Sequence, residues 1–107
     1  MAFADTLKTL PSIAQLSALE LLDENGQVVA TIENKPGKSG SLTVYAALAA
    51  RHGAISPAAA REGLDLFAEH TADARIHPGK HPNIDRLFDL IASGATLQVR
   101  LIPAQAS

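Results

Sequence analysis

Residues 18–33 decide the fold, and they read ALELLDENGQVVATIE. Asn25 and Gly26 both tolerate positive φ angles, which is what a two-residue type I′ turn requires. On each side of this pair, apolar and polar residues alternate with the period of a half-buried strand. The sequence therefore predicts a β-hairpin with strands near residues 18–24 and 27–33.

The turn also predicts the register of the hairpin, because a two-residue loop pairs Leu21 with Ala30 and Leu22 with Val29. One face then carries leucine, valine and isoleucine side chains, and the other face is mostly polar, as in a sheet with one buried side. The pair formed by Leu22 and Val29 is the exception, since it lies on the polar face. It is either an isolated exposed pair or the centre of a contact with another chain.

Four helices and one more strand are expected around the hairpin. The first helix carries Phe3, Leu7 and Leu10 at helical spacing and ends near Pro11. The second is capped by Ser41, is apolar on nearly every side and ends before Gly53, so we expect it to be buried. The other expected elements are a helix opened by Ser56-Pro57 and running to about residue 70, a helix from about residue 83 to Gly94, and a strand over residues 96–102.

The predicted fold class is α+β. A three-stranded antiparallel sheet, made of the hairpin and the C-terminal strand, packs with about four helices in the order α-β-β-α-α-α-β. The chain of 107 residues is expected to form one domain over residues 1–107. Helices covering one face of such a small sheet would leave its other face open.

Composition excludes several classes of function. The chain has no cysteine, which excludes thiol catalysis, disulfides and thiolate metal sites. Its net charge of -2 and its aromatic content of 4% argue against a nucleic-acid binder, which normally has a basic face and stacking rings. It shows neither a secretory signal nor a membrane span, so we expect a cytoplasmic protein with no membrane partner. No cofactor is expected.

Two loops carry the same tripeptide, Pro36-Gly37-Lys38 and Pro78-Gly79-Lys80, and each stands just before a predicted helix. Backbone N–H groups at a helix start, together with lysine, can bind phosphate or carboxylate groups. The loops could equally be flexible turns whose lysines keep them solvated. If the loops converge, the candidate anion site consists of Lys35, Gly37, Lys38, Ser39, Ser41, His77, Lys80 and His81.

Known catalytic and metal motifs do not fit these loops. A nucleotide-binding P-loop would need glycine at Ile32, and a nucleophile elbow would need glycine at Ser41. His81, Asp85 and Asp89 could share one helix face and offer metal ligands, but capping and surface charge explain them as well, so no metal site is assigned. Glu33, His70, His77 and Asp85 are acid–base candidates only if a cleft holds them, and the catalytic residues stay unassigned.

Two stretches of the chain resemble a known family. Residues 31–45, TIENKPGKSGSLTVY, and residues 81–88, HPNIDRLF, are similar to a small bacterial family described only as a domain of unknown function. The resemblance extends over nearly the whole chain. It implies a bacterial origin and no site.

Two hypotheses of function follow. The first is a non-enzymatic protein that acts through a homodimer or a protein partner, with Leu22 and Val29 at the contact. The alternative is a small-anion or phosphate-compound binding protein that uses the two Pro-Gly-Lys loops and could be an enzyme. Whether the loops converge decides the alternative.

Overall fold

The computed structural model describes residues 2–104. The described elements have the predicted order α-β-β-α-α-α-β, with one additional helix break. They are α1 (Phe3–Lys8), β1 (Leu16–Leu22), β2 (Val28–Glu33), α2 (Ser39–His52), α3 (Pro57–Leu66), α4 (Glu69–Ile76), α5 (Pro82–Ser93) and β3 (Gln98–Pro103). The α+β class is confirmed, and every predicted strand overlaps an observed one, although β1 begins and ends two residues before the predicted range of 18–24.

The sheet is antiparallel with strand order β2-β1-β3, so β1 is central. The predicted pair of Leu21 with Ala30 is confirmed, and Leu19 lies opposite Ile32 in the same register. The predicted pair of Leu22 with Val29 is wrong, because a register shift after Leu21 places Leu22 opposite Val28. One extra residue in β2 forms a bulge, and a bulge changes which side chains share a face.

The hairpin turn is also different from the prediction. Gly26 has a φ of +79°, and Ala68 is the one non-glycine residue with a positive φ in the described chain, so Asn25 does not adopt the type I′ conformation. The Gly26 N–H donates to the Asp23 carbonyl at 3.0 Å, and the Asp23 carboxylate accepts from the N–H groups of Asn25 and Gln27. This longer turn, held by the Asp23 side chain, changes the pairing only next to the turn, at Leu22, and leaves the predicted register from Leu21 outward unchanged.

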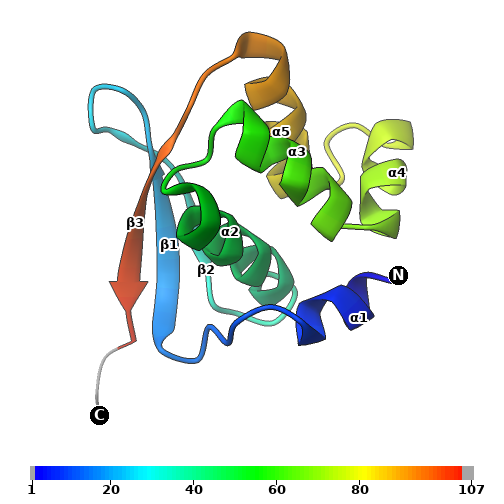
Figure 1. The fold of residues 1–107 in the computed structure, drawn as a ribbon, viewed down its shortest axis with the longest axis horizontal. Coiled ribbons are helices and arrows are strands. Elements are labelled where there is room, and N and C mark those ends of the chain that lie inside the picture. The colour runs from blue at the N-terminus through cyan, green and yellow to red at the C-terminus, as the bar shows by residue number, and fades with distance from the viewer. Residues whose placement is uncertain (1, 105–107) are drawn as a thin grey trace.

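All five helices of residues 2–104 lie on one side of the sheet (Figure 1). Helix α2 packs on β1 and β2, while α3 contacts both α2 and α5. As predicted, α2 is central: Leu42, Val44, Tyr45 and Leu48 have no exposed surface. A helix with so few polar positions is stable only when other elements cover it on several sides.

Most predicted helix ends are confirmed. Ser56 caps α3 by accepting a hydrogen bond from the Ala59 N–H at 3.1 Å, and Gly53 and Gly94 end α2 and α5 in the left-handed conformation. The predicted start of α2 at Ser41 is wrong, because the N-cap is Lys38 and the helix already includes Ser39. Ser41 therefore lies inside the first turn and does not cap the helix.

The helix predicted to run from Ser56 to about residue 70 is broken in two at Ala68, which has φ 55° and ψ -123°. The His70 N–H donates to the Phe67 carbonyl at 3.1 Å, which closes a tight turn around Ala68. The Thr71 hydroxyl donates to the Leu64 carbonyl at 2.6 Å and so satisfies the end of α3. The break turns α4 away from α3 and carries His70 with it.

The sheet residues proposed as a partner surface have different exposures. Leu22 is only 7% exposed, whereas its neighbours on β2, Val28 and Val29, are 46% and 52% exposed. A contact surface on this part of the sheet would thus consist of the β2 valines rather than of Leu22. None of the helices within residues 2–104 is long and apolar enough to cross a membrane.

Candidate functional site

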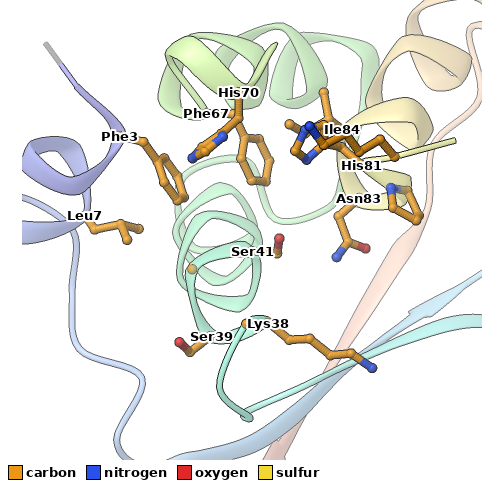
Figure 2. A pocket seen from close by; sticks show the side chains of 14 residues that line it. Phe3, Leu7, Lys38, Ser39, Ser41, Phe67, His70, His81, Asn83 and Ile84 are labelled. Atoms are coloured by element: carbon orange, nitrogen blue, oxygen red, sulfur yellow. The ribbon is translucent and has the colours of Figure 1, made fainter. Parts of the chain in front are cut away.

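The two Pro-Gly-Lys loops converge on one pocket of about 560 Å³ (Figure 2). The first loop and the start of α2 supply residues 37–41, and the second loop and the start of α5 supply residues 80–84. Phe3 and Leu7 of α1, with Phe67 and His70 from the α3–α4 turn, complete the lining. The two loops therefore converge, as the composite anion site requires.

Both tripeptides form the same turn, which explains why the sequence repeats. The Lys38 N–H donates to the Lys35 carbonyl at 2.9 Å, and the Lys80 N–H donates to the His77 carbonyl at 3.1 Å. The central residues are proline and then a glycine with positive φ, 85° at Gly37 and 92° at Gly79. This is a type II β-turn: the proline ring fixes the negative φ of the first central residue, and glycine tolerates the positive φ of the second. Each turn places a lysine next to the start of a helix.

A small polar network joins the starts of α2 and α5. The buried Tyr45 hydroxyl of α2 donates to the Asn83 carbonyl at 2.6 Å. Arg86 donates to the Asn83 Oδ1 at 2.8 Å and to the Tyr45 oxygen at 3.2 Å. Because Arg86 occupies the amide oxygen, the Asn83 NH₂ group remains as a donor, and Figure 2 shows it facing the space above Lys38.

The starts of both helices leave free hydrogen-bond donors at the pocket. Within residues 2–104, the backbone N–H groups of Gly40, Ser41 and Asn83 have no protein acceptor. The Ser41 hydroxyl also lacks a partner in this part of the chain, and it lies between the ring side chains and Lys38 in Figure 2. Such N–H groups, at the positive end of a helix dipole, attract anions.

The two lysines of the first loop differ in whether a carboxylate pairs with them. The Lys35 amine lies 3.1 Å from the Glu33 carboxylate, outside the pocket lining. The Lys38 amine has no carboxylate partner among residues 2–104, and its side chain lines the pocket. Of the two, Lys38 is the cation available to a ligand.

The second loop gathers its cations around one carboxylate, Asp73 of α4. Its oxygens lie 2.6 Å from His81 Nε2, 3.0 Å from Lys80 Nζ and 3.2 Å from His77 Nδ1. The hydrogen bonds from His81 and Lys80 hold the pKa of the Asp73 carboxyl well below its ordinary value, since they stabilise the charged form. Asp73 therefore fixes the loop and partly neutralises it.

Comparison with known proteins identifies the family. The family model of an uncharacterised protein conserved in bacteria, DUF2322, matches residues 3–101. The chain belongs to this family. No curated protein and no solved structure matches the chain.

In this DUF2322 protein, the structure groups six of the eight candidate anion-site residues around the pocket. They are Gly37, Lys38, Ser39, Ser41, Lys80 and His81. The other two, Lys35 and His77, lie outside the lining and pair with Glu33 and Asp73. Both are the first residues of their turns, so their side chains diverge from the lysines that end those turns.

Sequence analysis missed the residues that close the pocket, namely Phe3, Leu7, Phe67 and Ile84, and it missed Asp73. The four apolar residues were readable only as core positions, because helical spacing gives no sign that a core position borders a cavity. Asp73 did leave a signal. It precedes His77 by four residues, the spacing of a helical ion pair.

The alternative use of His81, Asp85 and Asp89 as metal ligands gains no support. Within residues 2–104, no three histidine, cysteine or acidic side chains are placed to hold one metal ion. His81 is paired with Asp73, and the Asp85 carboxylate accepts a hydrogen bond from the Gly79 N–H at 2.9 Å. Both side chains thus support the second turn.

Proposed function

We propose that this protein binds a small anion, the phosphate or carboxylate group of a small molecule, in the pocket between the two Pro-Gly-Lys turns. The supporting observation is the convergence of two helix starts on one cavity that also contains Lys38. A phosphate group accepts several hydrogen bonds at once, and free donors from Gly40, Ser41 and Asn83 face the same pocket.

Charge in the lining supports the same proposal. Lys38 and Lys80 contribute positive charge, and no acidic residue of the described chain belongs to the lining. The protein as a whole is slightly acidic, with a net charge of -2, so this positive region is local. Affinity for an anion should fall as salt concentration rises, because exposed charges are screened.

Calorimetric titration with inorganic phosphate at low salt tests the proposal, and the chain supplies a matched control. Lys38→Ala should weaken binding about tenfold, since a hydrogen bond to a charged group is lost. Lys35→Ala removes the same charge from the same loop, but Lys35 is paired with Glu33, so binding should stay within about twofold. Equal losses in the two variants would contradict a defined site.

A second candidate is self-association through β2, for which the exposed Val28 and Val29 are the specific observation. Strand β2 is at an edge of the sheet and can pair with a second copy. Light scattering on the wild type and on Val29→Lys tests this candidate. A dimeric mass that the substitution halves would support it, and a monomeric wild type would exclude it.

A further inference from the structure

The pocket has a second wall that an anion alone does not use. Ring side chains from α1, from the junction of α3 and α4 and from the loop before α5 make up this wall: Phe3, Phe67, His70 and His81. The Phe3 and Phe67 rings stack with centroids 5.5 Å apart and an interplanar angle of 19°, and His70 meets Phe3 edge-on at 4.9 Å. Figure 2 shows these rings on one side of the pocket and Lys38 on the opposite side.

The ring of Phe3 is held in place. Its backbone N–H donates to the Glu69 carboxylate at 2.7 Å, and a Cβ atom at Gly40 would lie 3.1 Å from the ring. Gly40 thus lets the ring rest directly on the backbone of α2, next to the free N–H groups. A ring fixed in this way costs little conformational entropy when a ligand packs on it.

The size of the pocket also exceeds what a bare anion requires. About 560 Å³ is within the range of sites for organic molecules, roughly 300–1,000 Å³. Inorganic phosphate bound at the helix starts would leave Phe3 and Leu7 in contact with water. An organic group attached to the anion would cover these apolar side chains and add favourable burial.

We infer that the ligand is a phosphate-bearing compound with a flat, unsaturated ring, the phosphate at the starts of α2 and α5 and the ring against Phe3 and His70. This inference rests on the proposed anion binding and adds the class of ligand. A flat ring is favoured over a bulky aliphatic group because aromatic side chains attract it through stacked and edge-on contacts.

Titration of the full chain with three probes tests the ligand class. Phenyl phosphate and cyclohexyl phosphate have the same charge and similar size, but only the first is flat, and inorganic phosphate has no organic group. We expect phenyl phosphate to bind about tenfold more tightly than inorganic phosphate and about threefold more tightly than cyclohexyl phosphate.

A variant separates the ring wall from the anion donors. Phe3→Leu should reduce the ratio of the phenyl phosphate affinity to the inorganic phosphate affinity, both measured on the same variant, to about twofold. Phe88→Leu is the matched control, because Phe88 lies under Arg75 outside this pocket, and it should keep the full preference. Circular dichroism verifies that each variant is folded.

The outcomes distinguish this inference from the proposed function. Equal affinities for phenyl and inorganic phosphate in the wild type would overturn the ring inference and leave anion binding intact. Tighter binding of cyclohexyl phosphate would also overturn it, because any apolar group would then suffice. If none of the three probes binds, anion binding fails and the ring inference fails with it.

Discussion

The Tyr45 hydroxyl donates a 2.6 Å hydrogen bond to the carbonyl of Asn83, and this contact joins the two helices whose starts form the pocket. Tyr45 is completely buried in α2, and Asn83 is in the first turn of α5. A buried hydroxyl needs a partner, and the Asn83 carbonyl supplies the acceptor. The core of the protein thus sets the geometry of its candidate site.

Tyr45→Phe should therefore affect both stability and binding. Removing the hydroxyl leaves the Asn83 carbonyl without this donor, and we expect the free energy of unfolding to fall by about 1–2 kcal/mol. Phosphate affinity should fall severalfold, although Tyr45 does not line the pocket. Urea denaturation and calorimetry measure the two effects. An unchanged affinity would show that the position of Asn83 does not depend on this bond.

Alkaline pH provides a separate test of the burial of Tyr45. Burial raises its pKa from 10.0 to about 12, with Arg86 opposing the shift. A raised pKa in the folded state means that the contribution to stability is complete below pH 10.0 and is lost as the pH rises through about 12. The stability difference between wild type and Tyr45→Phe should shrink over that interval, as measured by urea denaturation at several pH values. A constant difference would contradict the pKa shift.

The sequence predicted those features that depend on local chemistry. Asn25-Gly26 marked the hairpin, Ser56-Pro57 marked the start of α3, and Gly94 marked the end of α5. Each of these residues acts through its own backbone or its nearest neighbours, so a single sequence contains the information. The order of elements and the α+β class followed from such signals.

What the sequence could not predict depends on contacts between distant segments. The predicted pair of Leu22 with Val29 failed because the Asp23 side chain accepts two backbone hydrogen bonds and lengthens the turn, which displaces Val28 and Val29 relative to Leu22. From the sequence, a shared site was expected only if the two Pro-Gly-Lys loops converged, and the sequence did not predict that they do. The ring wall of the pocket remained hidden because Phe3 and Phe67 are 64 residues apart and meet only in the folded chain.

The strained backbone at Ala68 predicts that replacing this alanine with glycine raises the free energy of unfolding, whereas such a replacement usually lowers it. Its φ of 55° and ψ of -123° form a conformation in which glycine is the preferred residue. Ala68→Gly should therefore stabilise the protein by about 1 kcal/mol, despite the greater flexibility of glycine in the unfolded chain. Thermal and urea denaturation measure the change.

An alanine in ordinary helical conformation is the control for Ala68. Ala72 is exposed in the middle of α4, and Ala72→Gly should destabilise the protein by about 1 kcal/mol. Opposite signs for the two substitutions would verify the strain. A loss of stability in both variants would contradict it.

Close packing between helices predicts that Gly63 of α3 does not tolerate a side chain. A Cβ atom there would lie 2.8 Å from a Leu87 methyl and 2.9 Å from a Leu48 methyl. Gly63→Ala should therefore lower the free energy of unfolding by about 1–3 kcal/mol, even though alanine is the better helix former. Arg61→Ala, at an exposed position of the same helix, should change it by less than about 0.5 kcal/mol. A more stable Gly63→Ala variant would show that the methyl groups can move aside.

Asp73 predicts a linked effect on acid stability and on anion binding. Hydrogen bonds from His81 and Lys80 lower its pKa from the ordinary value of 3.8, so its contribution to stability is present above that pH and is lost as the pH falls below it. Wild type should be more stable than Asp73→Asn at pH 6, and the difference should shrink toward pH 3. The same substitution removes a negative charge that touches two residues of the pocket lining, Lys80 and His81. Phosphate should therefore bind Asp73→Asn severalfold more tightly in calorimetry at pH 7. Weaker binding would mean that Asp73 serves the site mainly by holding His81 and Lys80 in position.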